Sequence, residues 1–383
     1  MIVAEMHDQL ATLRKLAAAA LPTICDLTEE ICLIPAPSYH EERRARFVAE
    51  QLRTRGLSAE IDEIGNVVAR RKGRGTAKSL LLAAHTDTVF PIDTAITVRR
   101  ENGTMVGPAI GDNSLAVASL IELVTILDEA RIETPGDLLL VANVGEEGLG
   151  NLRGIRAVCD RYGGELGGVI ATEGHNVGRV THGAVGSKRI RVTVEGPGGH
   201  SWGAFGQPSA IHELGLIVGE IARIEVPTEP KTTFNVGLIE GGVSVNTIAP
   251  RATAVIDMRS VDPDALAHLA GEVGAIISRR RTDLVTTSVE VLGERPAGWT
   301  AASAGIVQAA SAILRQLGIE PVLNASSTDA NIPISRGIPA ICVGLTHGSG
   351  AHRVDEMIEI APIEQGVVQL GLLAAAFPVN SSR

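Results

Sequence analysis

Two adjacent carboxylates, Glu146 and Glu147, follow the continuous apolar run LLLVANV at residues 138–144. Such a run is typical of a buried strand, and α/β proteins bind ligands just beyond the carboxyl ends of their strands. One carboxylate there can hold a metal ion while its neighbour accepts and delivers a proton. By itself, the pair is also typical of an acidic turn or of the start of a helix, where the helix dipole favours negative charge.

A second candidate pair, His85 and Asp87, closes the apolar run SLLLAA at residues 79–84. Residues two apart on a strand point to the same face. A carboxylate beside a ligand histidine can hold the free ring nitrogen and so fix the tautomer of the ring. On its own, this spacing fits a capped strand end as well as a metal site.

Three further residues occupy similar positions. Asp112 lies in the segment AIGDNS that opens a helix, Glu173 ends the run GGVIAT, and His352 lies in a Gly-rich loop after the run PAICVG. Each alone is typical of a cap, a turn or a surface histidine. Together with His85 and Glu147 they give two histidines and three carboxylates at strand ends, which suits two borderline divalent ions bridged by one carboxylate.

The elements that must position these residues alternate between helices and buried strands. Periodicity makes most of the first ~45 residues helical, in two stretches that end at the break around residues 35–37. Further helices are predicted at 41–55, 113–130, 152–162, 302–317 and 362–377, and buried strands at 79–84, 138–144, 168–172 and 339–344. This alternation predicts an α/β domain with a mixed sheet flanked by helices.

The pattern changes between residues 187 and 293. Residues 188–195, KRIRVTVE, alternate polar and apolar side chains, as a half-exposed antiparallel strand does. Helices at about 208–224 and 263–280 and strands at about 233–239, 253–259 and 286–292 complete a β-α-β-β-α-β order. That order is typical of a ferredoxin-like α+β domain. We therefore predict that domain at 187–293, inserted into a larger domain made of 1–186 and 294–383.

Size and composition narrow the class of protein. A chain of 383 residues favours two domains, and the net charge of −10 disfavours a nucleic-acid partner. The N-terminus lacks the features of a signal peptide, and residues 16–21 are too short an apolar run to span a membrane. The four cysteines show no CxxC spacing, so we expect them to be reduced and buried. These features predict a soluble cytoplasmic protein that binds neither nucleic acid nor membrane.

The chain resembles the dinuclear zinc amidohydrolase family that includes peptidase T, carboxypeptidase G, aminoacylase and succinyl-diaminopimelate desuccinylase. The matching motifs run in the family's order along essentially the whole chain: LLLAAHTDTV (80–89), GDNS (111–114), VGEEGLG (144–150), ATEG (171–174), GPGGHSW (196–202), GGVSVNTIAP (241–250), DMRS (257–260) and GAHRVDE (350–356). The segment SSTDANIPISRGIPAICVG (326–344) is most similar to the peptidase-T-like branch. The resemblance implies a zinc-peptidase-like catalytic domain with a lid and dimerisation domain inserted in it.

The resemblance also implies two Zn²⁺ ions as cofactors, with Co²⁺ or Mn²⁺ as alternatives. Five side chains would hold them, namely His85 and Glu173 on one ion, Glu147 and His352 on the other, and Asp112 between the two. In this family the bridging aspartate often precedes a non-proline cis peptide, which the resemblance places at Asp112–Asn113.

The remaining site residues follow from the same resemblance. Glu146 would be the general base that takes a proton from a zinc-bridged water, and Asp87 would orient His85. His200 would steady the oxyanion from the lid, in the site of the partner subunit of a homodimer. Asn246 and Arg259 would bind the carboxylate of the substrate, although GPGGHS also fits a plain loop and Arg259 an ion pair within the sheet.

Three functions are compatible with this set of residues. The first is a metallopeptidase acting on small peptides, as an aminopeptidase or a dipeptidase. The second is a deacylase that hydrolyses N-acyl- or N-carbamoyl-amino acids. Many deacylases have Met-Lys-Gly after the bridging aspartate where this chain has Asn113-Ser114-Leu115, which favours the peptidase. The third, remote alternative is a binding protein without catalytic activity.

Overall fold

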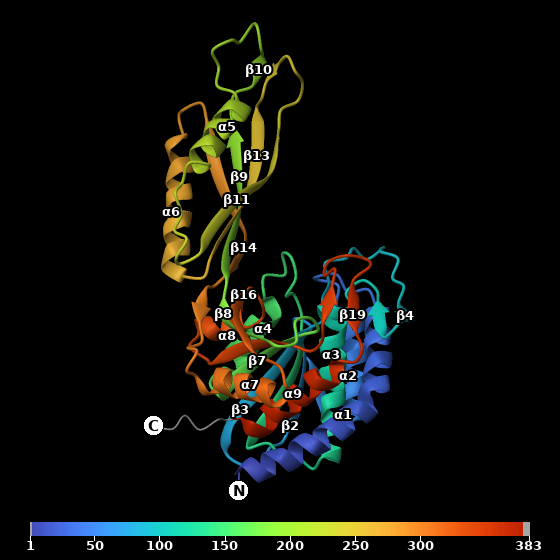
Figure 1. Cartoon of the computed structure of the whole chain (residues 1–383). Coiled ribbons are helices and arrows are strands. Elements are labelled where there is room, and N and C mark those ends of the chain that lie inside the picture. Colours follow the sequence, from blue (N-terminus) through green and yellow to red (C-terminus); the bar gives the residue numbers. More distant parts are fainter. Residues whose placement is uncertain (1, 378–383) are drawn as a thin grey trace. The chain divides into compact units, whose positions relative to one another are not determined.

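The computed structural model describes residues 2–377, and it divides the chain into two compact units. One unit contains the chain up to Ala184 and from Trp299 onward, and the other contains Val185–Gly298 (Figure 1). The second unit is thus continuous in sequence and interrupts the first. The predicted fold class, a mixed α/β domain with an inserted α+β domain, is confirmed.

A nine-stranded mixed sheet forms the centre of the first unit, in the order β1-β2-β6-β3-β7-β17-β8-β15 with β16 beside β8. The strands are β1 (Ala59–Ile61), β2 (Val67–Arg71), β3 (Ala77–His85), β6 (Gly136–Asn143), β7 (Leu166–Glu173), β8 (Arg179–Ala184), β15 (Gly298–Trp299), β16 (Val322–Ser326) and β17 (Ala340–Gly344). The four adjacent strands β6, β3, β7 and β17 are parallel. Parallel strands are buried on both faces, which explains their continuous apolar runs.

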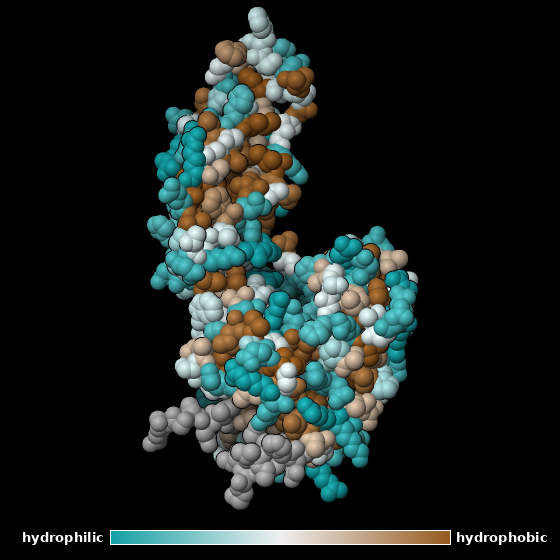
Figure 2. All heavy atoms as spheres, in the orientation of Figure 1, coloured by the Kyte–Doolittle hydropathy of each residue, from teal (hydrophilic) through white to brown (hydrophobic). Residues whose placement is uncertain are grey.

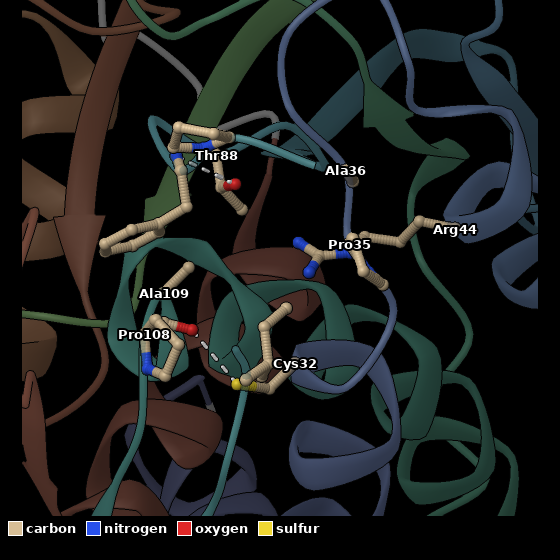
Figure 3. A pocket seen from close by; sticks show the side chains of 10 residues that line it. Cys32, Pro35, Ala36, Arg44, Thr88, Pro108 and Ala109 are labelled. Atoms are coloured by element: carbon tan, nitrogen blue, oxygen red, sulfur yellow. Dashed lines mark hydrogen bonds between the residues drawn. The ribbon is translucent and has the colours of Figure 1, made fainter. Parts of the chain in front are cut away.

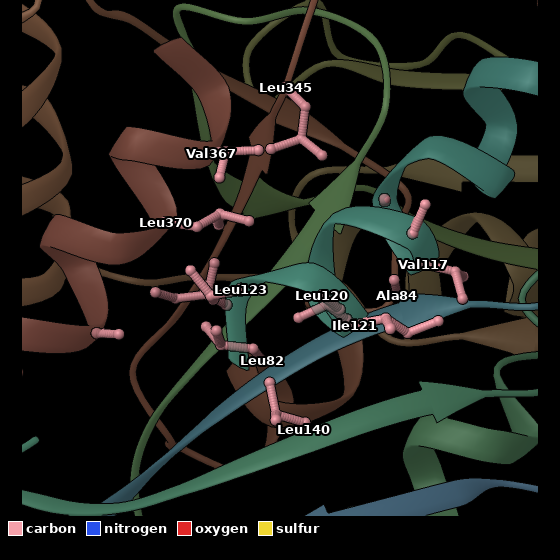
Figure 4. Close-up of a cluster of buried hydrophobic side chains, with 14 of the residues drawn as sticks. Leu82, Ala84, Val117, Leu120, Ile121, Leu123, Leu140, Leu345, Val367 and Leu370 are labelled. Carbon is pink, nitrogen blue, oxygen red and sulfur yellow. The ribbon is translucent and has the colours of Figure 1, made fainter. Parts of the chain in front are cut away.

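Helices cover both faces of this sheet (Figure 1). Alternate side chains of β3 belong to different clusters, because successive residues of a strand point to opposite faces. Leu82 packs in one cluster with Leu123, Leu140 and Leu370 (Figure 4). That cluster also involves helices α1 (Ile2–Cys32), α2 (Glu42–Thr54), α3 (Leu115–Glu129), α7 (Gly305–Gln316) and α9 (Ile363–Ala376). Leu81 packs in the other cluster, with residues of α4 (Arg153–Tyr162) and α8 (Asn331–Ser335).

The described residues contain one helical stretch, Ile110–Glu129, that is long and apolar enough to cross a membrane. Its most apolar window is 89% buried inside the protein. A core helix is apolar all round for the same reason as a membrane span, because neither contacts water. The burial therefore identifies this stretch as a helix of the core.

Several elements differ from the sequence prediction. The two predicted N-terminal helical stretches form one helix, α1, with Pro22 inside it. Strands β8 and β16 were not predicted. The segment VLNAS in β16 gives no strand signal, because it has neither an apolar run nor a strict alternation. A small sheet of β18 (Gly348–Ser349), β19 (Met357–Glu359), β5 (Thr104–Val106) and β4 (Arg99–Glu101) was also missed. The predicted cis peptide at Asp112–Asn113 is present.

The second unit is a four-stranded antiparallel sheet in the order β11-β13-β9-β14. Its elements are β9 (Gly186–Glu195), α5 (Ala210–Ile221), β11 (Thr232–Gly241), β13 (Arg251–Ser260), α6 (Pro263–Arg279) and β14 (Thr286–Arg295). Apolar side chains of β9 and β13 form a core with both helices, and the alternate side chains of these strands are half-buried. The predicted ferredoxin-like order of elements is thus the observed one.

A short pairing of β10 (Gly199–His200) with β12 (Thr247–Ile248) extends beyond this sheet. Large apolar side chains beside it are exposed, and Figure 2 shows such side chains on the surface of this unit. They are Trp202, Phe205, Val243 and Val245.

Candidate metal centre

The five predicted metal ligands converge at one edge of the large sheet. His85 is the last residue of β3 and Glu173 the last residue of β7, and Glu147 follows the end of β6. Asp112 lies in the segment Ile110–Ser114, whose backbone is kinked and not helical at Asp112 and Asn113, and His352 lies beyond β17 and β18. Because β6, β3, β7 and β17 are adjacent and parallel, their carboxyl ends meet at the same edge.

Asp112 lies between two pairs of side chains. Its Oδ1 is 3.1 Å from His85 Nε2, which in turn is 3.7 Å from Glu173 Oε2. Its Oδ2 is 3.2 Å from His352 Nε2, which is 3.1 Å from Glu147 Oε1. In each triad, the possible ligand atoms lie within 4.8 Å of one another. The two oxygens of one carboxylate are thus divided between two groups of donors.

The cluster reaches from the interior to the surface. His85 is fully buried, Glu147 is buried, and the His352 side chain is 56% exposed. Burial raises the pKa of Glu173 to about 7. Although burial also disfavours the charged form of Asp112, hydrogen bonds from His352 and His85 lower its pKa. The cluster is therefore exposed to solvent at His352.

The donor set fits two divalent cations. Three carboxylates converge within a few ångströms, and their mutual repulsion is relieved by positive charge between them. Imidazole and carboxylate together suit Zn²⁺ and neighbouring borderline ions. The Nε2 atoms of both histidines face the carboxylates, so the donor atoms already point toward one another. His85 and Glu173 would hold one ion, His352 and Glu147 the other, and Asp112 would contact both.

Glu146 lies beside the same cluster. One of its carboxylate oxygens is within 4.8 Å of ligand atoms of His85 and Glu147, and the residue is only 7% exposed. A carboxylate at this depth and distance can reach a group bound at the cluster. Its position is compatible with the proton transfer that the resemblance implies.

Asp87 contacts more than the histidine that it was predicted to orient. The Nδ1 atom of His85 is 3.1 Å from the backbone carbonyl of Asp87 and 3.5 Å from its carboxylate. The two carboxylate oxygens instead accept the backbone N–H groups of Glu146 and Glu147, each at 2.9 Å. The fully buried Asp87 side chain therefore holds the peptide that carries both glutamates.

Two residues that the sequence analysis missed support Asp87 and its strand. The hydroxyl of Ser38 donates to Asp87 Oδ2 at 2.6 Å and lies 3.2 Å from the Glu147 carbonyl. The buried Arg44 guanidinium donates to the carbonyls of Thr86 and Ile34. Arg44 lines a small cavity behind this strand end together with Cys32 and Pro108 (Figure 3). No local motif marks Ser38 or Arg44, because their partners are distant in sequence.

Replacing Asp87 by asparagine is expected to lower kcat/KM by about 10–100-fold, the usual effect of losing a residue that supports a metal ligand. Asparagine has one oxygen, so either Glu146 N–H or Glu147 N–H would face an amide donor. Steady-state kinetics with zinc quantification measures the effect. Asp62→Asn is a matched control, since Asp62 accepts the N–H groups of Ile64 and Asn66 in a separate turn. Equal activity of both variants would contradict the role of Asp87.

The three predicted residues of the second unit do not lie together. His200 and Asn246 are neighbours, since His200 pairs with Thr247 and Ser201 N–H donates to the Asn246 carbonyl at 3.0 Å. Strand β13 begins at Arg251, shortly after Asn246 in the sequence. Arg259 lies eight residues further along this strand, which corresponds to roughly 26 Å in an extended strand. Its Nε donates to Asp257 at 2.7 Å, so Arg259 has an ion pair within the sheet.

His200 has a defined tautomer. Its Nδ1 accepts the backbone N–H groups of Trp202 and Gly203, at 3.2 and 3.3 Å. A neutral imidazole that accepts at Nδ1 carries its proton on Nε2. The exposed ring therefore presents an Nε2–H donor, which is the form that can bind a developing oxyanion.

Two histidines and three carboxylates that could hold metal ions, with one further carboxylate beside them, fit the site of a metal-dependent hydrolase. The sequence model of Peptidase family M20/M25/M40 matches residues 81–375. The chain belongs to this family, which confirms the predicted family and the prediction of an enzyme.

Individual relatives differ in the substrates that their names record. The chain is 29% identical to succinyl-diaminopimelate desuccinylase of Corynebacterium glutamicum, over 88% of this chain and 92% of that protein. It is 28% identical to the cytosol non-specific dipeptidase of Escherichia coli, over 66% of this chain and 56% of that protein. In fold it is similar to a tripeptidase from Staphylococcus aureus, with a TM-score of 0.80, 20% identity, and 93% and 98% of the two chains covered.

Proposed function

We propose that this metal-dependent amide hydrolase cleaves small peptides that have a free amino terminus, as an aminopeptidase or a dipeptidase. The observation that carries the proposal is the density of carboxylates at the site. Asp329, from the segment STDAN, is 2% exposed and accepts from Asn143 Nδ2 at 2.8 Å. Burial is the main cause of the raised pKa of Glu173, and the charges of Asp112 and Asp329 add to it.

This charge favours a substrate with a positive group. Asp112, Glu146, Glu147, Glu173 and Asp329 together exceed the charge of two divalent cations. The charge of the buried Arg44 guanidinium is matched by that of the buried Asp87 carboxylate, so it does not remove this surplus. An α-ammonium group is attracted to such a surplus of negative charge, whereas a succinyl carboxylate is repelled by it.

Zn²⁺ is the cofactor that we propose, held by His85 and Glu173, by Glu147 and His352, and by Asp112 between them. Bound there, the two ions would supply the Lewis acidity that activates water and polarises the scissile carbonyl. The Glu146 carboxylate would accept the proton of the attacking water and deliver it to the nitrogen of the leaving amine. The Asp87 carboxylate would hold the Glu146 backbone in place during both transfers.

The second unit is proposed to act as a lid and to form a homodimer. One chain's Arg259 and His200 are too far apart within that unit to touch the same small substrate. In a homodimer, residues of two chains could contact the same substrate. Arg259 of one chain would bind the substrate's carboxylate, together with His200 and Asn246 of the partner chain. The Nε2–H donor of His200 suits an oxyanion, and Arg259 suits a carboxylate. The proposed domain limits are 187–293 for the lid and 1–186 with 294–383 for the catalytic domain.

A cytoplasmic location is also proposed. All four cysteines are free and buried, which fits a reducing compartment. Burial raises the pKa of Cys32 and of Cys159 to about 12, so these thiols are held in their unreactive form. Small peptides are the proposed partners, and neither nucleic acid nor membrane is among them.

A panel of matched substrates tests the proposed function. The same dipeptides and tripeptides are offered with a free, an acetylated and a succinylated amino terminus, beside N-carbamoyl amino acids, with zinc added. We expect kcat/KM for the free peptides to be at least about tenfold higher, which corresponds to ~1.4 kcal/mol of attraction for the ammonium group. The His200→Ala variant, run on the same panel, is expected to lose kcat rather than raise KM.

The deacylase alternative predicts the opposite order. It is supported by the 29% identity to the desuccinylase over nearly the full length of both proteins. Faster hydrolysis of acylated substrates than of free peptides would establish it in place of the peptidase. The absence of bound zinc, together with no hydrolysis after reconstitution, would instead favour the remote alternative of a binding protein.

A further inference from the structure

A buried carboxylate–imidazole pair, Glu356 and His175, lies directly behind Asp112. Glu356 Oε1 contacts His175 Nε2 closely and accepts the backbone N–H groups of Gly111 and Asp112, at 3.1 and 2.9 Å. The backbone carbonyl of Glu356 also accepts the N–H of Gly107 at 2.9 Å. Glu356 therefore connects the segment that leads to Asp112 with the loop that carries His352. In the sequence, His352 lies four residues before Glu356.

The pair is enclosed tightly by backbone. A Cβ atom at Gly111 would lie 2.5 Å from His175 Nε2 and 2.8 Å from Glu356 Oε1. A Cβ at Gly348 would clash with the other side of the ring, at His175 Nδ1. Glycine at both positions allows the imidazole to fit between the two segments. The ring therefore has little freedom to move, and neither has the carboxylate that it contacts.

Stability alone gives a poor reason for this arrangement. Glu356 is 0% exposed, and within the described part of the chain its second oxygen, Oε2, has no hydrogen-bond partner. A buried carboxylate with an unsatisfied oxygen costs free energy, and an apolar pair of similar volume is often at least as stable. The residues that the pair touches are those next to the centre of the metal cluster, which points to a role there.

We propose that Glu356 and His175 are positioning residues that fix the Asp112 carboxylate between the two groups of metal ligands. The inference rests on the proposed function, because it assigns Asp112 as the residue shared by both ions. To contact both, Asp112 must present Oδ1 and Oδ2 to opposite sides at the same time. Glu356 holds the N–H groups of Gly111 and Asp112, so it fixes the direction in which Asp112 projects. His175 holds Glu356 in the position that accepts both N–H groups.

An equivalent contact holds another ligand. Asn113 Nδ2 donates to the Thr172 carbonyl at 2.8 Å, and Asn113 Oδ1 accepts Gly174 N–H at 3.1 Å. Asn113 thus holds the residues on both sides of Glu173. Asp87 does the same for the peptide of Glu147. Glu356 is the third member of this pattern, in which a buried side chain fixes a ligand through neighbouring backbone groups.

Calorimetric titration of the full-length apoprotein with Zn²⁺ tests the proposal, without relying on activity. We expect His175→Ala and Glu356→Leu to weaken zinc binding by about 10–100-fold, because supporting residues have effects of that size. His175→Gln is the conservative variant, since its amide N–H can reach the position of His175 Nε2 and donate to Glu356. It is expected to bind zinc within about threefold of the wild type, an estimate from the retained hydrogen bond.

His182→Gln is the matched control. His182 is also a buried histidine of the first unit, but its Nδ1 is bonded to the Thr300 carbonyl at 2.7 Å and its ring packs against Trp299. A purely structural role for His175 would lower the unfolding temperature of His175→Ala, as for the control, and leave the zinc affinity of the folded protein unchanged. That result, with the same unchanged affinity in Glu356→Leu, would overturn the proposal.

The outcome for the wild type separates this proposal from the proposed function. A wild-type chain that binds two Zn²⁺ ions while His175→Ala and Glu356→Leu bind them equally well disproves only the positioning role. A wild-type chain that binds no metal disproves the proposed function itself. If His175→Ala does not fold, Glu356→Leu and His175→Gln still provide the comparison, because both keep approximately the volume of the original side chain.

Discussion

Replacing Glu146 by glutamine is expected to lower kcat by about 10²–10⁴-fold, the usual contribution of a general base. Glutamine has the same shape but cannot accept a proton at neutral pH. The backbone N–H of residue 146 would still donate to Asp87, so the peptide that carries Glu147 would keep its position. Zinc content is therefore expected to match that of the wild type. Assays of free-dipeptide hydrolysis measure kcat, and metal analysis of the same samples measures the zinc content.

Glu147→Gln is the contrasting variant, because it changes the adjacent carboxylate by the same chemistry. Glu147 Oε1 is 3.1 Å from His352 Nε2, so this variant is expected to lose metal affinity together with activity. Glu165→Gln, at a partly exposed ion pair with Arg70, is expected to behave as the wild type. Normal turnover by Glu146→Gln would show that the base has been assigned to the wrong glutamate.

Asp112→Ala is expected to have the largest effect on metal binding, with the loss of both ions and of activity by on the order of 10⁴-fold or more. Asp112 contacts both groups of ligands, at 3.1 Å from His85 and 3.2 Å from His352. Without the ions, the attacking water would keep its ordinary high pKa, which bound divalent ions would otherwise lower toward neutrality. Glu147→Ala is expected to weaken the ion shared with His352 and to leave the other ion in place.

Elemental analysis after dialysis against zinc distinguishes these two variants by the number of ions retained per chain. Asp128→Ala serves as the control, since Asp128 is a half-exposed partner of Arg71 in the last turn of α3, at the opposite end of that helix from Asp112. Retention of two ions by Asp112→Ala would rule out its bridging role. Retention of one would show that only one side of the carboxylate is a ligand.

The sequence was most informative where a short segment combines a strand with its ligand. The runs before His85, Glu147 and Glu173 are apolar because their parallel strands are buried on both faces. The polar residue that follows each run is therefore conspicuous. The same argument located the inserted domain, whose strand β9 alternates because one of its faces is not covered by helices.

Other elements gave weaker signals for physical reasons. Strand β16 is half-exposed and pairs only with β8, so burial imposes little pattern on VLNAS. The polar supports of the site also lack a pattern. Ser38, Asn113 and His175 are single residues whose hydrogen-bond partners lie 49 to 181 positions away. A local window cannot contain both members of such a pair.

The sequence by itself determined which residues end the strands, and the resemblance of its motifs determined which family's chemistry they perform. Strand periodicity and motif spacing are properties of neighbouring residues, so they survive without a structure. Only the tertiary structure decided that Asp112 divides its two oxygens between His85 and His352, and that Asp87 holds the peptide of Glu146 and Glu147. It also decided that Glu356 and His175 lie behind Asp112. These contacts join segments that the order of strands in the sheet brings together, and that order depends on the packing of the whole first unit.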